Sequence, residues 1–354
     1  MTAFIKLEQV SKAFGTLTVI DRLDLEIARG EFLSLLGPSG SGKTTILMML
    51  AGFIAPSNGS IWLEDRRIEH LPPHRRNMGV VFQNYALFPH MTVAENVAFP
   101  LMMRGGSKPD ILKRVDAALD MVKLTDLKDR KPAQLSGGQQ QRVALTRALV
   151  FEPTVVLMDE PLGALDKQLR EHMQLELREL HRRLGLTIVF VTHDQGEALT
   201  MSDRIAVFNA GKIEQLAPPE AIYDRPQTRF VAEFIGETNL LSGKIRSCDA
   251  NSVHVAINGG PVIRVASFGR LHEGTPALVS LRPEQVWLSS APGLVNSIPV
   301  TVLDTVYHGD HLRVRMAGNG IELIARVERK TASWTVGTAA HVTFEPDACT
   351  LIAQ

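Results

Sequence analysis

The chain has 354 residues, enough to bury a sizeable hydrophobic core and to form two domains or more. Lys plus Arg equals Asp plus Glu at 38 each, and this neutral balance argues against nucleic acid or a bilayer surface as a partner. The two cysteines, Cys248 and Cys349, lack paired spacing, which excludes a zinc knuckle and fits a reducing compartment. At the N-terminus, Lys6 and Glu8 interrupt the apolar residues, so we expect no secretion signal, and no window approaches the roughly twenty apolar residues that span a bilayer.

The first informative stretch is GPSGSGKTT, which lies between an apolar run at Phe32 to Leu36 and a helix-compatible run at Thr44 to Leu50. Such a strand, glycine-rich turn and helix can bind phosphate, because the glycines let backbone N–H groups converge and the helix N-terminus adds partial positive charge. Taken alone, the stretch also fits an ordinary turn with a surface lysine. As a phosphate loop it predicts a site for ATP with Mg²⁺, formed by Gly37, Ser39, Gly40, Ser41, Gly42, Lys43, Thr44 and Thr45.

Three side chains of this phosphate loop have specific expected roles. Lys43 is expected to bridge the β- and γ-phosphates, where its positive charge is needed. Thr44 carries a hydroxyl in the first helical turn, which suits Mg²⁺, and Thr45 is expected to face the α-phosphate. The loop therefore predicts both the cation and the metal ligand of a triphosphate site.

A second possible anion site lies further along the chain. Met78 to Gln83 reads as a buried strand, and Tyr85 to Val150 is mostly helical, with a loop marked by Pro100, Gly105, Gly106 and Pro109. Within it, LSGGQ has capping-box spacing, so a helix should begin near Gln139 with uncovered amides. Alone this could be an ordinary helix start. After a phosphate loop, we expect it to cover the γ-phosphate held by another copy, through Ser136, Gly137, Gly138 and Gln139.

The run VVLMDE predicts a parallel strand at Val155 to Asp159 that is buried on both faces. The carboxylates of Asp159 and Glu160 lie at the carboxyl end of this strand, where function is expected. Because neighbouring side chains of a strand point in opposite directions, we expect the two carboxylates to have different roles. We assign Asp159 to the magnesium shell through water, and Glu160 to orienting and deprotonating the attacking water. A solvated acidic turn is the alternative, which the upstream phosphate loop disfavours.

The remaining patterns divide the chain in two. A strand at Thr187 to Thr192 and a hairpin at Arg204 to Gln215 complete an α/β core, and a proline-punctuated helical connector follows. From about Ser242 the character changes to short alternating strands, which predict a small all-β, barrel-like domain. The expected strands are Val253 to Ile257, Val262 to Ala266, Ala277 to Leu281, Val300 to Tyr307, Leu312 to Met316 and His341 to Glu345.

The phosphate loop, LSGGQ and VVLMDE, in this order, resemble the ATP-binding-cassette (ABC) ATPases over roughly the first 235 residues. The resemblance implies an α/β fold: a P-loop (RecA-like) ABC nucleotide-binding domain over residues 1–238, with an inserted helical subdomain at about 85–150. Residues 239–354 are expected to form a C-terminal all-β, OB/TOBE-type domain. They resemble the tails of solute-importer ATPases, most clearly at SLRPEQVWL, where Arg282, Pro283 and Glu284 recur as a family turn.

The resemblance also implies roles for four single residues. Gln83 looks like the family's glutamine loop, which contacts the metal or the lytic water, and Asp166 in PLGALD looks like the loop that crosses the dimer. His193 matches the γ-phosphate sensor, and Phe14 the aromatic that stacks on adenine. Phe14 could instead be a core aromatic, His193 an exposed loop histidine, and Asp166 simply a helix start. The expected catalytic set is Glu160, His193, Gln83 and Lys43, with Thr44, Gln83 and Asp159 toward the metal.

Two residues depart from the family pattern. Phe14 can stack but offers no hydroxyl, which leaves base selectivity weak, and Gly163 stands where many relatives have serine, which could loosen the crossing loop. Neither departure implies an inactive site.

The family likeness implies the ATP-hydrolysing subunit of an importer, peripheral on the cytoplasmic face of a bacterial inner membrane. Its expected partners are a second copy packed head to tail, two membrane permease subunits and, indirectly, a solute-binding protein, with no nucleic acid. FVAEFIGETNLL and the tail look most like polyamine (spermidine and putrescine) importers, followed by ferric-iron and phosphonate importers. The alternative class is a soluble ABC ATPase that acts on nucleic acid or ribosomes, which normally has two cassettes or basic insertions.

Overall fold

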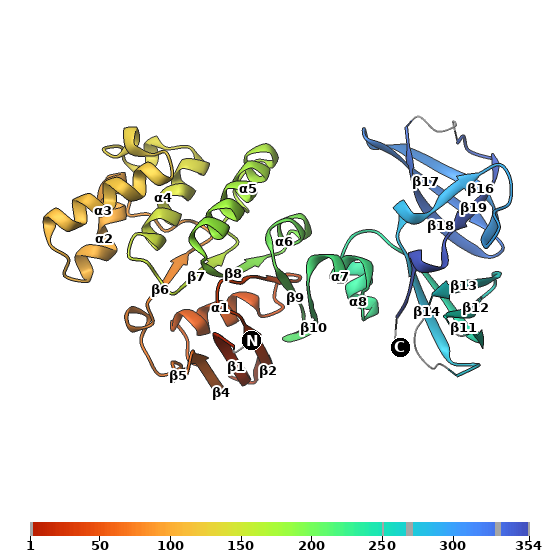
Figure 1. Cartoon of the computed structure of the whole chain (residues 1–354), viewed down its shortest axis with the longest axis horizontal. Coiled ribbons are helices and arrows are strands. Elements are labelled where there is room, and N and C mark those ends of the chain that lie inside the picture. Colours follow the sequence, from red (N-terminus) through yellow and green to blue (C-terminus); the bar gives the residue numbers. More distant parts are fainter. Residues whose placement is uncertain (1–2, 250, 267–271, 330–333, 353–354) are drawn as a thin grey trace. The chain divides into compact units, whose positions relative to one another are not determined.

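The computed structural model describes residues 3–249, 251–266, 272–329 and 334–352. The chain divides into two compact units, Met1–Pro219 and Glu220–Gln354, and both are drawn in Figure 1. The connector helices fall at this division: α7 (Pro219–Asp224) begins at the end of the first unit, and α8 (Arg229–Phe234) lies within the second. The limit predicted from the sequence, between residues 238 and 239, lies after both helices.

The first unit is built on a six-stranded sheet in the order β10-β9-β3-β8-β7-β6. The five strands from β9 to β6 are parallel, and β10 pairs antiparallel to β9 at one edge. The α/β prediction is confirmed, and three strands match residue for residue. The strands are β3 (Phe32–Leu36), β6 (Met78–Val81), β7 (Val155–Asp159), β8 (Thr187–Thr192), β9 (Arg204–Asn209) and β10 (Lys212–Ala217).

Alternating side chains of the central strands enter two different cores. Leu33, Leu157 and Val189 pack in the cluster that includes helix α1 (Lys43–Ala51). Phe32 and Phe190 point the other way, into a cluster with helix α5 (Lys167–Leu184). Because neighbouring residues of a strand face opposite sides, a sheet covered on both faces reads as a continuous apolar run. The carboxyl ends of its strands are therefore left to carry the site.

A second, antiparallel sheet in the order β2-β1-β4-β5 packs on the cluster around α1, and the sequence patterns did not indicate it. In β1, Lys6 and Glu8 point away from the core and form an ion pair with an N–O distance of 2.7 Å. Bulges shift the β1–β2 register three times, which interrupts the regular alternation that predicts a strand. The strands are β1 (Ile5–Phe14), β2 (Leu17–Ile27), β4 (Asn58–Leu63) and β5 (Arg66–Arg67).

The stretch between strands β6 and β7 is helical, as predicted, and has its own apolar cluster. Its helices are α2 (Val93–Met103), α3 (Lys108–Met121) and α4 (Gly137–Leu149). The predicted loop is shorter than expected, because Pro100 lies inside α2 and Pro109 lies in the first turn of α3, where its missing N–H is tolerated. A short helix α6 (Gln195–Met201) follows β8.

The described residues of the second unit contain most of α7, α8 and two five-stranded antiparallel sheets that share one apolar core, so the all-β prediction is confirmed. All six expected strands are present, while four others were not anticipated. One sheet contains β11 (Asn239–Cys248), β12 (Ser252–Ile257), β13 (Val262–Ala266), β14 (Pro276–Leu281) and β20 (Cys349–Ile352). The other contains β15 (Trp287–Ser289), β16 (Asn296–Tyr307), β17 (His311–Gly318), β18 (Ile321–Glu328) and β19 (Ala339–Phe344).

The family turn at Arg282 has a visible structural role in the second unit. Arg282 is buried and donates hydrogen bonds to the backbone oxygens of Tyr223, Ala232 and Glu237, which belong to α7, α8 and the segment after them. The Tyr223 hydroxyl in turn donates to Glu284 at 2.6 Å. The turn therefore fixes the connector helices to the β sheets.

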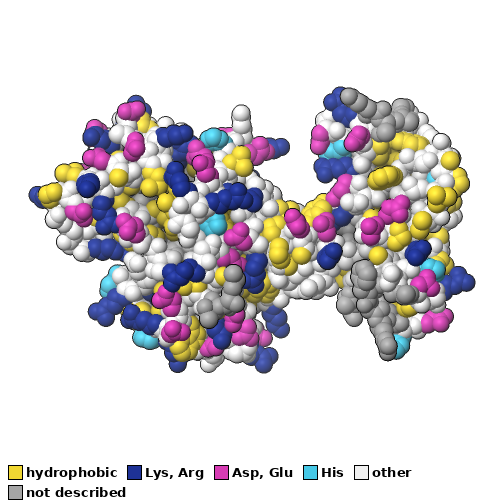
Figure 2. Space-filling model, in the orientation of Figure 1, with side chains coloured by type: hydrophobic (Ala, Val, Ile, Leu, Met, Phe, Trp, Pro, Cys, Tyr) yellow, Lys and Arg dark blue, Asp and Glu magenta, His cyan; other side chains and the backbone are white. Residues whose placement is uncertain are grey.

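Charged side chains of both signs are intermixed on the face of the molecule drawn in Figure 2, as the neutral composition predicts. No helix among the described residues combines the length and apolarity needed to cross a bilayer.

Candidate active site

The phosphate loop follows β3 and ends at the N-terminus of α1. Gly40 and Gly42 have φ values of 79° and 101°, in the left-handed region that glycine adopts most readily. A Cβ on Gly42 would lie 2.4 Å from Ile20 Cδ1, and one on Gly37 would lie 2.4 Å from the Phe208 carbonyl oxygen. Packing against a backbone carbonyl therefore requires glycine at position 37, while the left-handed backbone favours glycine at positions 40 and 42.

Lys43 lies beneath this loop and is only 5% exposed. Its ammonium donates to the carbonyl oxygens of Gly37 at 2.9 Å and Pro38 at 2.8 Å, and to Ser41 Oγ at 3.3 Å. Burial lowers the Lys43 pKa, while the nearby carboxylates of Glu160 and Asp159 act in the opposite direction. A buried cation whose hydrogen-bond partners are dipoles is well suited to receive an anionic ligand.

Asp159 ends β7 beside the phosphate loop, where its carboxylate is 9% exposed. Thr44 Oγ1 donates to Asp159 Oδ1 at 3.1 Å, which joins the two predicted metal-side residues directly. Burial raises the Asp159 pKa, the Thr44 hydrogen bond lowers it, and Glu160 raises it further. A hydroxyl and a carboxylate are oxygen donors of the kind that Mg²⁺ prefers.

Gln83, Glu160 and His193 meet although they come from three different strand ends. Gln83 Nε2 lies 3.2 Å from Glu160 Oε2, and His193 Nδ1 lies 3.1 Å from Glu160 Oε1. Glu160 has a φ of 43°, which turns the chain at the end of β7, while its amide still donates to the Val191 carbonyl of β8. Its side chain remains 21% exposed, which leaves room for a water molecule to approach. Sheet topology thus assembles a carboxylate, an amide and an imidazole at one edge.

The LSGGQ segment forms the N-terminus of α4, with the capping box that its spacing predicts. Ser136 N donates to Gln139 Oε1 at 2.9 Å, and Gln139 N donates to Ser136 Oγ at 3.4 Å. The helix begins at Gly137, two residues earlier than expected. Within the described part of the chain, no hydrogen bond or ion pair joins Ser136, Gly137, Gly138 or Gln139 to the phosphate loop, so one chain does not bring its two predicted anion sites into contact.

The surroundings of the other predicted residues are as follows. Phe14 ends β1 and is 49% exposed, with Lys12 Nζ 5.0 Å from its ring centroid, so it is not a core aromatic. Asp166 caps α5 by accepting a hydrogen bond from Leu169 N at 2.9 Å, which is the helix-start role considered as its alternative. A Cβ on Gly163 would meet only the Glu160 carbonyl oxygen at 3.5 Å, so a serine would fit there. Ser39 is exposed, Thr45 is half-buried and Ser41 is buried.

Arg170 is a residue near the site that the sequence patterns did not indicate. Arg170 in α5 donates to Asp194 Oδ2 at 3.1 Å and to the Leu165 carbonyl at 3.0 Å. It therefore joins the residue after His193 to the residue before Asp166. An arginine in the first turn of a charged helix gives no signal of such a role, because its partners become neighbours only through the fold.

Two family models match the chain. One described as "ABC transporter" matches residues 20–163, and one described as "TOBE domain" matches residues 279–352. The first covers the phosphate loop, the LSGGQ segment and the VVLMDE strand. The second covers most of the β strands of the second unit.

Curated relatives match most of the chain or nearly all of it. A protein of Rubrobacter xylanophilus named spermidine/putrescine import ATP-binding protein PotA is 45% identical over 353 residues, which is 98% of this chain and 93% of the relative. A protein of the same name from Pseudomonas aeruginosa is 50% identical over 288 residues, or 81% of this chain and 79% of the relative.

Solved structures match somewhat more than half of the chain. A dimeric post-hydrolysis state of the ATP-binding cassette MJ0796, bound to ADP and phosphate, is 36% identical with a TM-score of 0.55, and covers 61% of this chain and 98% of that one. The structure of cbiO1 from Clostridium perfringens, part of the ABC transporter complex cbiONQ, is 30% identical with a TM-score of 0.59, and covers 63% of this chain and 91% of that one.

Proposed function

The chain belongs to the ATP-binding-cassette transporter family and is an ATPase, and we propose that it powers an importer of the polyamines spermidine and putrescine. The proposal rests on one observation. The side chains of Gln83 and His193 both contact Glu160, which lies next to Asp159 and the phosphate loop. Polyamine as the solute is supported by the names of relatives that are 45% and 50% identical to this chain over 353 and 288 aligned residues.

The ligand is ATP with Mg²⁺, and the residues present fit both. The buried ammonium of Lys43 and the left-handed glycines of the phosphate loop suit a triphosphate. Thr44 and Asp159 would hold Mg²⁺, with Gln83 toward the same side. No group of three or more His, Cys, Asp or Glu in the described residues could hold a metal by itself. That fits Mg²⁺, which takes few protein ligands and completes its shell with water and phosphate oxygens.

The chemistry assigned to the chain is the activation of a water molecule. Glu160 orients this water and takes its proton, while the Gln83 amide fixes one carboxylate oxygen and His193 the other. Lys43 neutralises charge on the phosphates, and Phe14 offers an exposed ring for the adenine. When bound, Mg²⁺ supplies further neutralisation of the phosphates.

A complete site requires a second copy. The LSGGQ segment presents free helix-end amides away from the phosphate loop of its own chain, so we assign it to the γ-phosphate held by a partner packed head to tail. Asp166, at the exposed start of α5, would lie at the crossing between the two copies. ATP contacts both copies only when they are closed, and this differential affinity shifts the pair toward the closed state.

The importer assignment places the chain at the cytoplasmic face of the membrane, with two permease subunits and a solute-binding protein supplied by other genes. The segment from Gln83 to Asn96 is where we expect a short permease helix to bind, and within it Tyr85 is buried and belongs to the core. Phe88 and Pro89 remain accessible in the same segment and are the better candidates for that contact.

The test is reconstitution of the chain with its permease subunits and binding protein in liposomes. Spermidine or putrescine is expected to stimulate ATP hydrolysis and to be taken up, whereas Glu160→Gln should abolish both. Stimulation by ferric iron or a phosphonate instead would mean that the solute is not a polyamine, while the assignment as an importer would stand. Co-purification of RNA or ribosomes in place of permease subunits would overturn the importer itself.

A further inference from the structure

The segment that carries Gln83 turns through an unusual backbone conformation. We call Gln83 to Phe88 the glutamine turn. Within it, Tyr85 and Ala86 have φ values of 61° and 47°, so two consecutive residues with a Cβ occupy the left-handed region. Outside glycine and asparagine this conformation is disfavoured, and it persists only where the surroundings hold it. The glutamine turn therefore needs an external support.

Arg147 supplies that support from helix α4. Its Nη1 donates to the Ala86 carbonyl and its Nη2 to the Tyr85 carbonyl, both at 2.8 Å. Its guanidinium carbon also lies 5.6 Å from the centroid of the Phe88 ring. The planar fork of an arginine can reach two adjacent carbonyl oxygens at once, which a lysine ammonium cannot match in geometry. The two bonds end on the carbonyls of the two left-handed residues.

The downstream end of the turn is held separately. Asn96 in α2 is fully buried, and its side chain accepts from Phe88 N at 2.9 Å and donates to the carbonyls of Phe88, Met91 and Thr92. Upstream, Gln83 follows β6 and its amide meets Glu160. The left-handed pair lies between these two fixed points, so its conformation determines where the exposed Gln83 side chain is directed.

We propose that Arg147 is a positioning residue of the ATPase, which holds the left-handed pair so that Gln83 reaches Glu160 and which couples this turn to the helix that begins with the LSGGQ segment. The inference rests on the proposed roles of Gln83 and Glu160. Because Arg147 and Gly137 belong to one continuous α4, a displacement of the turn is transmitted to the helix N-terminus that would face the partner's phosphate. Burial also lowers the Arg147 pKa, as expected for a guanidinium that is partly withdrawn from water.

The first test compares Arg147→Met and Arg147→Lys with wild type in ATP turnover. Methionine keeps an apolar stem but removes the fork, so kcat is expected to fall at least about 10-fold while KM for ATP stays within about 3-fold, since the phosphate loop is untouched. Lysine should recover only part of the loss. Arg114→Met is the control, because Arg114 in α3 donates to the Val150 carbonyl and Glu152 but does not contact the turn.

The second test is rescue by glycine. Ala86→Gly removes the cost of the left-handed conformation, so in the Arg147→Met background it should bring kcat back to within about 3-fold of wild type. If the role of Arg147 were purely structural, Arg147→Met would lower thermal stability and Ala86→Gly would not restore kcat. The Arg114→Met control shows how much activity is lost through reduced stability alone.

The third readout does not depend on activity. Hydrogen exchange at the amides of Tyr85 to Phe88 should accelerate in Arg147→Met and not in Arg114→Met. Unchanged exchange at these amides, or kcat per folded molecule equal to wild type, would overturn the proposal. Failure of the proposed function is distinguishable, because it would appear as wild-type turnover in Glu160→Gln, whatever the state of the glutamine turn.

Discussion

Three ionisable side chains of the site are placed where they favour a charged ligand. Lys43 is a buried cation whose hydrogen-bond acceptors are two carbonyls and a hydroxyl, and burial lowers its pKa. Asp159 is buried beside Thr44, and burial raises its pKa. Glu160 keeps an exposed edge between an amide and an imidazole. A triphosphate with its metal would supply the missing opposite charges, so binding stabilises groups that are destabilised in the free protein.

The role of Glu160 can be tested with its closest isostere. Glu160→Gln keeps the size of the side chain but removes the base, so we expect kcat to fall at least about 100-fold while ATP binding is retained. Blocked hydrolysis should also trap a stable dimer, measured by light scattering at saturating ATP. Glu152→Gln, which changes an exposed carboxylate paired with Arg114, is the control and should leave turnover unchanged. A Glu160→Gln chain that stays monomeric with ATP would contradict the water-activation role.

The burial of Asp159 gives a prediction about pH. Its folded pKa lies above the unfolded one, so the folded state binds this proton more tightly, and stability decreases as pH rises from the ordinary carboxyl pKa through the folded pKa. Asp159→Asn should therefore raise the melting temperature of the nucleotide-free protein near neutral pH. The gain should shrink as pH falls through the raised folded pKa of Asp159 toward the ordinary pKa of a carboxyl group.

Thermal unfolding of Asp159→Asn and wild type across this pH range is the measurement. Asp126→Asn, which changes an exposed carboxylate, serves as the control and should give no such trend. A gain for Asp159→Asn that grows toward low pH would have the wrong sign and would exclude burial as the dominant cause. If Asp159→Asn also loses ATP turnover, the Asp159 carboxylate is needed in the ATPase site even though it destabilises the folded protein.

Among the secondary-structure elements, helix ends carry much of the organisation. The N-terminus of α1 closes the phosphate loop, and the N-terminus of α4 presents the LSGGQ amides. Both expose uncovered N–H groups, which together with the helix dipole favour anions. In the second unit, the connector helices α7 and α8 are instead held by Arg282, whose guanidinium contacts carbonyls at or near their C-terminal ends.

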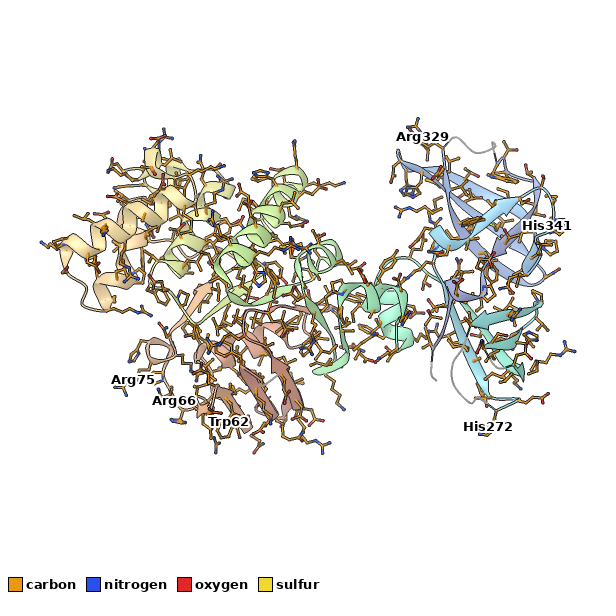
Figure 3. All side chains as sticks on the ribbon, in the orientation of Figure 1. Trp62, Arg66, Arg75, His272, Arg329 and His341 are labelled. Atoms are coloured by element: carbon orange, nitrogen blue, oxygen red, sulfur yellow. The ribbon has the colours of Figure 1, made fainter. Side chains whose placement is uncertain are left out.

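Removal of Arg282 should loosen the connector helices. Arg282→Met leaves the backbone acceptors of Tyr223, Ala232 and Glu237 without this donor, so we expect the second unit to lose about 2–4 kcal/mol. The chain has three tryptophans, and Trp62 is the one in the first unit (Figure 3). Urea unfolding in a Trp62→Phe background therefore reports on the second unit through Trp287 and Trp334.

The matched control for this prediction is Arg313→Met. Arg313 is more exposed and forms an ion pair with Glu237 at 2.7 Å, so its removal should cost less than about 1 kcal/mol. Equal losses for the two arginine variants would mean that Arg282 acts as an ordinary surface ion pair rather than as the link between the helices and the sheets.

A single chain contains all the predicted parts of an ATPase site, but they are not all in contact with one another. The phosphate loop, Asp159 and Glu160 are adjacent, while the LSGGQ segment lies in the helical part without a bond to them. A site completed in trans predicts that two inactive variants complement each other. Lys43→Ala lacks the phosphate-binding cation, and Gly137→Asp places a carboxylate where the partner's phosphate would lie.

The Gly137 change is compatible with the fold, because a Cβ there makes only an ordinary 3.4 Å contact with Leu165. Each variant alone should be inactive, whereas a mixture forms heterodimers with one intact composite site and should recover up to about a quarter of wild-type turnover. Gly137→Asn, which has the same shape without the charge, should retain more activity than Gly137→Asp. A mixture no more active than its parents would contradict a site shared between chains.

The predictions from the sequence agree best with the structure where the interactions join residues that are close together in the chain. The strands β3, β7 and β8 matched residue for residue, since a strand buried on both faces needs only apolar side chains. The capping box of α4 also depends on neighbours three residues apart. The strand β6 ended two residues early, because Gln83 leaves the sheet to reach Glu160. The bulged β1–β2 pair was missed, since bulges break the period of two.

The sequence by itself determined the α/β class, the all-β tail, and the identity and order of the phosphate-binding motifs, because each depends on residues close together in the chain. Only the tertiary structure decided which side chains meet: Gln83 and His193 on Glu160, Arg170 between two loops, Arg147 on the glutamine turn and Arg282 on the connector helices. Apart from Arg170 and Leu165, which are 5 positions apart, these partners are separated by 24 positions for Arg170 and Asp194 and by up to 77 for Gln83 and Glu160. Contacts across such distances follow from how strands and helices pack, and no local pattern in the sequence encodes them.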